Sequence, residues 1–238
     1  MFILAPVLGH RTIPPMIKAG FAIMLAMMLI PVASQTPLPE IESIWQLGLF
    51  AAKEMLIGVI IGAFFSLLFI AIRITGNIIG YQIGLIMASI LDPNTQTEFS
   101  MVSEFYFILG TLIFLAIDGH HAIITALADS YRVIPIGVFS FSGSLGEMLI
   151  RFSAYVFILA IKIGAPVMIT LFIMEVSLGV VARTVPQMNI FLVGIPLKIG
   201  FGFLVLAIAL PVFRFMMEKG MTFINKEVMT VLYSIGTT

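Results

Sequence analysis

The sequence predicts an all-α protein of kinked and broken helices, paired as hairpins and embedded in a membrane or in a larger assembly. Hydrophobic residues make up 61% of the 238 residues and charged residues 10%, whereas an average soluble domain is about 25% charged. The hydrophobic residues gather in runs that are apolar on every side, which disfavours the alternating strands of outer-membrane barrels. Several runs also contain proline, which kinks or ends a helix.

The apolar runs give the expected elements in chain order. They cover residues 19–39, 55–91, 105–128, 133–146, 152–182 and 190–213, and a polar tail follows at 214–238. A membrane span needs about 20 apolar residues, and few of these runs reach that length without a charge. We expect the runs to form a multi-pass arrangement within one domain that covers residues 1–238.

The run at 55–91 is too long for one ordinary span, because a straight helix of that length would measure roughly 55 Å. It must therefore tilt strongly, bend, or fold back near Gly76. Prolines in the other runs predict kinks or helix ends at Pro31, Pro166, Pro196 and Pro211.

Four charged residues lie inside the apolar runs: Arg73, Lys162, Glu175 and Lys198. Each would cost about 2.5–3.5 kcal/mol at the centre of a lipid-facing helix, so such residues normally face protein or water. We expect Arg73 and Glu175 to be buried. For Lys198, burial and extension toward the lipid headgroups are equally reasonable.

Composition and missing motifs narrow the function. Twelve Lys and Arg balance twelve Asp and Glu without a basic tract, so nucleic acid is not an expected partner. There is no cysteine, which excludes disulfides and Cys-ligated metal. HExxH, GxSxG, GxGD and P-loop motifs are absent. We therefore expect neither an enzyme nor a cofactor, and an energy source outside this chain. The N-terminus does not have the pattern of a signal peptide.

A polar tetrapeptide, Asp118-Gly119-His120-His121, interrupts the run at 105–128. It predicts a turn between two helices. A metal site is the less favoured interpretation, because adjacent histidines point in different directions on a helix and rarely share a metal.

A ladder of small residues occupies the end of the run at 55–91. Gly76, Gly80 and Gly84 follow one another at intervals of four, with Gln82 among them. On a helix such residues share one face, where another backbone can approach closely. The ladder is either packing within this chain or a docking groove for a second subunit.

Three sequence blocks resemble the FliR family of flagellar export-gate proteins. Residues 76–84 with Asp92-Pro93 resemble G-x-x-x-G-x-Q-x-G…D-P. Residues 119–121 and 135–137 are similar to G-H-x…P-x-G, and residues 183–198 to R-x-x-P-Q-M-N-x-F…G-x-P-L-K. The blocks keep the order and spacing of the family along nearly the whole chain. The resemblance implies that the chain starts after the first hydrophobic helix of the family.

The resemblance also implies a function. FliR-like proteins are non-enzymatic subunits of the flagellar type III export gate, with a fold like a fusion of FliP-like and FliQ-like hairpins. The expected partners are FliP-like, FliQ-like and FlhB-like proteins, the lipid membrane, and the unfolded flagellar proteins that pass through the gate. The expected location is the bacterial cytoplasmic (inner) membrane, at the flagellar basal body.

The sequence offers candidates for the gate itself. Asp92-Pro93-Asn94 ends the long apolar run with strong helix-breaking chemistry, and the resemblance implies that this loop is a plug in the pore. We expect Met87 and Ile90, just before the turn, to line the constriction, because an apolar ring excludes hydrated ions. The alternative is that both pack in an ordinary helix core.

Other residues are candidates for assembly contacts. Glu175 and Arg183 are eight residues apart, which is about two turns along one helix face, and we expect them to share an electrostatic environment. Pro186 should stop that helix. The third family block adds Gln187, Asn189 and Lys198 to the candidate contacts.

Three other functions stay open from the sequence. The first is the homologous gate of a virulence (injectisome) secretion system, with the same architecture and different cargo. The second is a stand-alone ion or solute transporter, although no convincing internal repeat is found. The third is a lipid-exposed scaffold without a pore.

Overall fold

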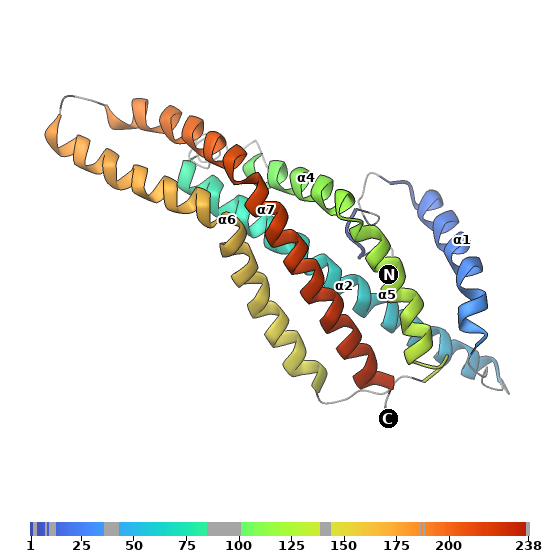
Figure 1. Ribbon diagram of the computed structural model, residues 1–238. Helices are drawn as coiled ribbons and strands as arrows, with labels where there is room; N and C mark the ends of the chain where they lie inside the picture. Colours follow the sequence, from blue (N-terminus) through green and yellow to red (C-terminus); the bar gives the residue numbers. More distant parts are fainter. Residues whose placement is uncertain are drawn as a thin grey trace. The chain divides into compact units, whose positions relative to one another are not determined.

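The described residues form six helices. The computed structural model describes residues 1, 4–7, 9, 13–35, 43–84, 101–138, 144–185, 187 and 189–236. All regular secondary structure within these residues is α-helix, and they contain no β-strand. This confirms the all-α class. In chain order the helices are α1 (Pro15–Ala33), α2 (Ile44–Ile83), α4 (Met101–Ala116), α5 (Gly119–Val133), α6 (Ser144–Thr184) and α7 (Ile190–Gly236) (Figure 1).

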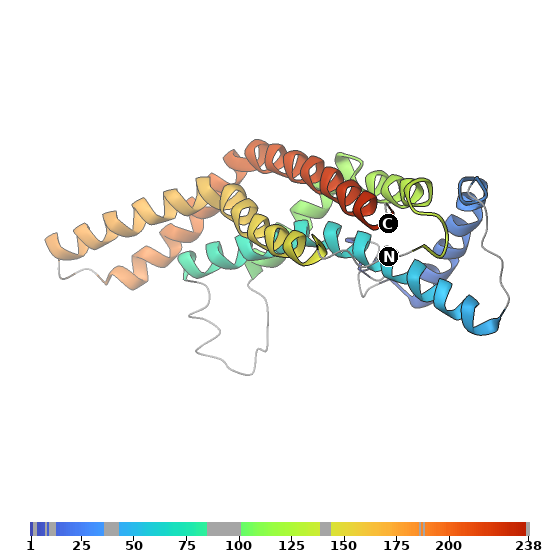
Figure 2. The ribbon, with the colours of Figure 1, turned by 90° about the horizontal axis from the view of Figure 1, so that it is seen from below.

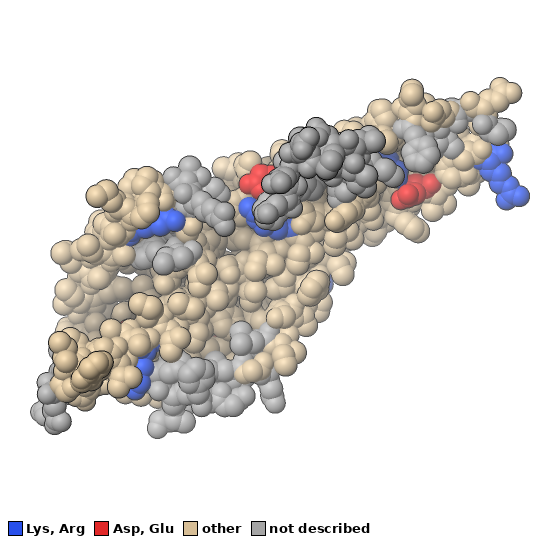
Figure 3. Space-filling model, turned by 180° about the vertical axis from the view of Figure 1, so that it is seen from behind, with Lys and Arg blue, Asp and Glu red and all other residues tan. Residues whose placement is uncertain are grey.

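Most of these helices suit a membrane. In the part of the chain that the structure describes, four segments are long and apolar enough to cross one, namely α1, α2, Ile150–Thr184 of α6 and Leu192–Gly236 of α7. The pair α4 and α5, taken together as one broken span, would be a fifth. Figure 3 shows a face covered mainly by uncharged residues, with a few separate charged side chains. The multi-pass expectation is therefore consistent with the structure.

α2 is one uninterrupted helix of 40 residues. It continues through Gly76 and ends at Ile83, so the fold-back near Gly76 that we considered does not occur. Gly84 follows with φ +87, and its N–H donates to the Tyr81 carbonyl oxygen at 3.1 Å. Glycine adopts this left-handed conformation without the steric cost that other residues carry, which explains why the helix stops there.

The four prolines that predicted kinks or helix ends do not end the helices that contain them. Pro31 lies inside α1, Pro166 inside α6, and Pro196 and Pro211 inside α7. Neighbouring side chains use some of the backbone acceptors around them. The Thr170 hydroxyl, for example, donates to the Pro166 carbonyl oxygen at 2.8 Å.

The structure confirms one expected helix break and differs from one expected element. The run at 105–128 is divided into α4 and α5 by a break at Ile117 and Asp118, as the polar tetrapeptide predicted. The segment 133–146 is not a helix in its described part, because α5 ends at Val133 and residues 134–138 form a turn. Pro135 and Gly137, which has φ +80, provide the turn chemistry.

The polar tail that we assigned to 214–238 is helical as far as Gly236, because α7 continues through it. Arg214 and Glu218 form an i,i+4 ion pair of 2.9 Å on its surface. Apolar residues recur there at helical spacing and are buried: Ile224, Val228, Val231, Leu232 and Ile235. Their spacing of three or four residues is the sequence signal for a helix, and the number of charged residues in the same segment made it easy to overlook.

The chain divides into two compact units. Unit 1 contains residues 1–69, 114–155 and 219–238. Its core includes Phe64 and Phe152, whose rings meet edge to face at 4.2 Å. An ion pair of 2.7 Å joins Arg151, near the start of α6, to Glu227, near the end of α7.

Within unit 1, the turn after α5 is attached to α2 by two consecutive charged residues. The Lys53 ammonium donates to the Gly137 carbonyl oxygen at 2.8 Å, and the Gly137 N–H donates to Glu54 Oε1 at 3.2 Å. A side chain at Gly137 would lie 2.7 Å from the Phe50 ring. The P-x-G block therefore marks a turn that packs directly on a helix.

Unit 2 contains residues 70–113 and 156–218. It comprises the second half of α2, most of α4, and a long antiparallel hairpin of α6 and α7. Figures 1 and 2 both show these two helices side by side out to the connection at 185–189. The core residues of unit 2 include Ile72, Ile79, Ile163, Leu171, Phe213 and Met217. The candidate site lies in this unit.

Candidate assembly site

The glycine ladder begins with a close contact between α2 and α4. A Cβ atom at Gly76 would lie 2.4 Å from the Cα atom of Ser103, closer than real Cβ atoms approach. Ser103 is fully buried, and its hydroxyl donates to the Arg73 carbonyl oxygen at 3.1 Å. Small residues allow such contact between helices in membranes. Gly76 therefore packs within this chain.

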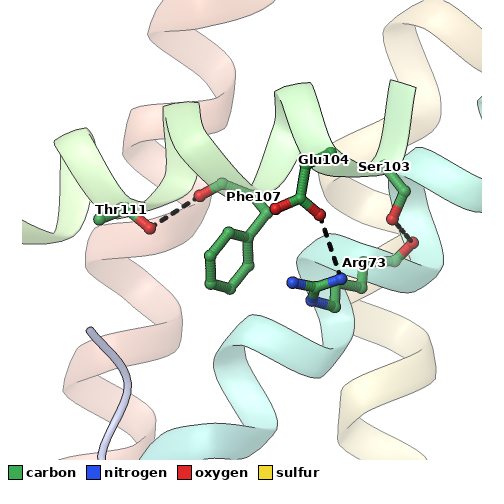
Figure 4. A network of polar contacts seen from close by, with 5 residues as sticks. All are labelled: Arg73, Ser103, Glu104, Phe107 and Thr111. Carbon is green, nitrogen blue, oxygen red and sulfur yellow. Dashed lines mark hydrogen bonds and ion pairs between the residues drawn. The ribbon is translucent and has the colours of Figure 1, made fainter. Parts of the chain in front are cut away.

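Arg73 lies beside this contact and faces protein (Figure 4). Its guanidinium is 3.3 Å from Glu104 Oε2 on α4, and its Cζ lies 4.2 Å from the centre of the Phe107 ring. The Arg73 side chain is 26% exposed, so it is half-buried, and the expected burial is met only in part. The free-energy cost of placing an arginine in a membrane is far lower when a carboxylate lies on one side of it and an aromatic face on the other than when it faces lipid alone.

Unit 2 also holds α2 against α6 through one hydroxyl. Thr75 is fully buried, and its Oγ1 lies 2.8 Å from the Ala160 carbonyl oxygen of α6 and 2.9 Å from the Ala71 carbonyl oxygen of its own helix. The Thr75 methyl group also occupies the space beside Gly164, where a Cβ would lie 2.9 Å from it. α2 is thus fixed against both α4 and α6.

The remaining ladder residues differ from one another. Gly80 is buried on α2. Gly84 has no described atom within 4 Å of its Cβ position and ends the helix instead of packing. Gln82 has a buried Oε1 atom without a hydrogen-bond partner among the described residues. The ladder therefore combines one close contact, one buried position and one helix end.

The α6–α7 hairpin carries the other candidate contacts. Lys198 on α7 lies 3.3 Å from Glu175 on α6; the Lys198 side chain is 16% exposed and the Glu175 side chain 61%. The expected burial of Glu175 is therefore wrong for this chain, because its carboxylate is paired at the edge of the hairpin. The expected neighbour, Arg183, is exposed on α6, and no acidic group among the described residues forms an ion pair with it.

The turn of the hairpin contains Gln187, which is exposed, and Asn189. The Asn189 side-chain oxygen accepts a hydrogen bond from the Leu192 N–H at 3.4 Å, so Asn189 caps the N-terminus of α7. α6 ends at Thr184, before Pro186. Pro186 itself and the gate candidates Met87, Ile90, Asp92, Pro93 and Asn94 lie outside the described residues.

The hairpin presents a wide apolar surface to its surroundings. Exposed large side chains lie on both helices within unit 2, including Phe157, Ile161, Ile169, Phe172, Ile173, Leu192, Phe201, Leu204, Ile208 and Phe215. Lys162 is exposed on the same part of α6. Exposed apolar area of this extent marks contact with lipid or with another protein.

Sequence reasoning missed several residues of this site. Ser103, Glu104 and Phe107 complete the surroundings of Arg73, and Thr75 joins α2 to α6. A signal for Glu104 existed, because a charge inside an apolar run needs a partner and Glu104 begins the next run.

These features define a class: a protein whose described part is all-helical, whose long apolar helices suit a membrane, and in which three of the internal charges, Arg73, Glu175 and Lys198, are paired between helices. The model of the family described as Bacterial export proteins, family 1, matches residues 1–223. The chain belongs to this family, as its resemblance to FliR proteins implied.

Curated relatives agree with the family. The flagellar biosynthetic protein FliR of Bacillus subtilis (strain 168) is 33% identical over 215 residues, which is 89% of this chain and 82% of the relative. The FliR protein of Aquifex aeolicus (strain VF5) is 33% identical over 90% of this chain and 82% of its own length. For the FliR protein of Escherichia coli (strain K12) the identity is 29%, over 87% of this chain and 78% of the relative.

Proposed function

We propose that this protein is a non-enzymatic subunit of the flagellar type III protein export gate. The observation that carries the proposal is the family match over residues 1–223. The relatives named flagellar biosynthetic proteins support it, because this chain aligns with most of the length of each. The same names favour the flagellar gate over the injectisome homologue. The gate would lie in the bacterial cytoplasmic membrane at the flagellar basal body.

We propose FliP-like, FliQ-like and FlhB-like proteins as the partners in this gate. The exposed apolar surface of the α6–α7 hairpin supports partners of this kind, because the hairpin also carries Glu175, Lys198, Arg183 and Lys162, which a purely lipid-facing surface would disfavour. Unfolded flagellar proteins are the proposed cargo. Their movement would be driven from outside this chain, whose sequence has no nucleotide-binding loop.

Within the gate, we propose that Met87 and Ile90 line the constriction and that Asp92, Pro93 and Asn94 form the turn of the plug. Their position supports this role, because they follow the end of α2 at Ile83 and precede a polar stretch in the sequence. Met suits such a ring, since a flexible thioether adapts to changing contacts.

A deletion of the gene tests the function. We expect loss of filament assembly and loss of hook and filament protein from the culture medium, with both restored by the intact gene. A non-motile strain that still assembles normal filaments would contradict the proposal and indicate a motor component. Loss of virulence-protein secretion with normal filaments would favour the injectisome homologue instead.

A further inference from the structure

A second cluster of polar side chains lies in unit 1, at the break between α4 and α5. Asp118, His120 and His121 each offer a metal-ligating atom, and these three atoms lie within 4.8 Å of one another. Asp118 Oδ1 and His121 Nδ1 are 3.3 Å apart, and the two imidazole rings are 4.1 Å apart at their centres. From the sequence we expected the adjacent histidines to point apart. The structure brings their rings together at the very first turn of α5.

The Asp118 carboxylate has no part in forming the helix. Asp118 is at the N-cap of α5, with φ 56, and its backbone carbonyl oxygen accepts the N–H groups of His121 at 3.0 Å and Ala122 at 3.2 Å. An aspartate at this position normally caps the helix with its side chain. Here that side chain makes no capping hydrogen bond within the described part of the chain, and it faces His121 instead.

The turn rests on a buried aromatic pair. A Cβ atom at Gly119 would lie 2.3 Å from Cε2 of Phe114, and Phe114 is fully buried with its ring 5.3 Å from that of Phe69. The backbone between the aspartate and the histidines is thus held directly on the core of unit 1. A fixed backbone lowers the entropic cost of gathering three ligands around an ion.

The three side chains are available as ligands, and two of them are accessible. His120 Nδ1 is buried and has no hydrogen-bond partner among the described residues, whereas a buried imidazole nitrogen normally has one. The side chains of His121 and Asp118 are 67% and 71% exposed, so an ion can reach them.

We propose that Asp118, His120 and His121 form a binding site for a divalent transition-metal ion, with Zn²⁺ as the representative ion. Two imidazoles and one carboxylate are ligands that Zn²⁺ binds at about 2.0–2.2 Å in tetrahedral geometry. Two ligands of a tetrahedral site at those bond lengths are separated by about 3.3–3.5 Å, and the Asp118–His121 pair already has that separation. A rotation of the His120 side chain would place its imidazole as the third ligand of the ion. A water molecule would then be the fourth ligand of the tetrahedral site.

Equilibrium dialysis against Zn²⁺ tests the site. The full chain is purified with its co-purifying proteins through a tag without histidine, stripped with a chelator, and its bound zinc is measured by mass spectrometry. We expect the wild type to bind one Zn²⁺ per copy of the chain. Asp118→Asn and His121→Gln should each lower the zinc affinity by at least about tenfold, because loss of a residue that only supports a metal ligand already has an effect of that size. Asn tolerates the left-handed conformation, so Asp118→Asn keeps the turn.

The matched control is His10→Gln, which removes the third histidine of the chain and should leave zinc binding unchanged. Substitution of Co²⁺ gives a second measurement, because visible absorption bands of a tetrahedral Co²⁺ ion should appear in the wild type and weaken in both cluster variants. Equal zinc affinity in the wild type and in Asp118→Asn would overturn the proposal, as would the absence of saturable zinc binding in the wild type. This experiment does not depend on export, so the two proposals can fail separately.

Discussion

The Cα atom of Ser103 occupies the space that a side chain at Gly76 would need, 2.4 Å from the Cβ position. The obstructing atom is backbone, so a small side-chain movement cannot relieve the clash. α2 and α4 can therefore keep their present distance only while residue 76 is glycine.

This contact gives the first prediction. We expect Gly76→Ala to force α4 away from α2 and to lower stability by about 1–3 kcal/mol, the usual cost of overpacking, with Gly76→Leu worse. The measurement is the thermal midpoint and yield, in detergent, of the complex that the chain forms with its co-purifying proteins. Gly48→Ala is the control, because Gly48 is on the same helix with no described atom within 4 Å of its Cβ position. If the two alanine variants had the same thermal midpoint and yield, the contact between Gly76 and Ser103 would not contribute to stability.

The second prediction concerns the surroundings of Arg73. Arg73→Met and Glu104→Gln should each reduce stability, because each leaves the other member of a 3.3 Å ion pair without its counter-charge. The double variant should lose less than the sum of the two, with a coupling of about 0.5–3 kcal/mol. A double-mutant cycle on thermal or denaturant unfolding measures this. Additive losses would mean that the pair does not interact in the assembled protein.

The third prediction separates the ion pair that the structure contains from the one that the sequence suggested. Glu175→Lys and Lys198→Glu should each reduce assembly, and the charge-swapped double variant should recover part of it, because the two groups lie 3.3 Å apart. Glu175→Gln combined with Arg183→Gln should instead be additive. Lys226→Gln, an exposed change on α7 outside unit 2, is the control. Recovery in the Glu175–Arg183 combination rather than in the swap would contradict this assignment.

The fourth prediction tests the proposed constriction. Changing Met87 and Ile90 together to Gly should make cells that express the assembled complex permeable to small ions, because the apolar barrier to hydrated ions is removed. Ion leakage and growth rate are the measurements, and the leak should vanish without the FliP-like partner. A complex that assembles normally and keeps the membrane tight would show that these residues do not form the seal.

The sequence predicted the helical class because composition and uniform apolar runs are strong signals, and it predicted the break at Asp118 because the chemistry of that tetrapeptide is local. It did not predict that α2 is continuous through Gly76. Whether a glycine ladder bends a helix or packs it depends on the neighbour, here Ser103, which lies 27 residues further along the chain.

In the candidate site, too, local features could be predicted from the sequence, whereas features that depend on helix packing could not. Arg73 could be recognised as a residue that needs a partner, but its partner on α4 depends on how the helices pack. The predicted polar tail was wrong at the C-terminal end, because surface charges such as Arg214 alternate there with the buried apolar stripe of α7. Asn189 was assigned to assembly from the family block, and the structure adds a local role that the sequence did not predict, because its side chain caps α7.

The measurement that tests the account most directly is the state of the purified chain. We propose that FliP-like and FliQ-like subunits cover the apolar surface and the charges of the α6–α7 hairpin. Co-expression with those proteins should therefore give one discrete complex by native mass spectrometry, while the chain alone in detergent should aggregate or give little yield. A stable, monodisperse monomer that does not join the co-expressed proteins would contradict the central claim.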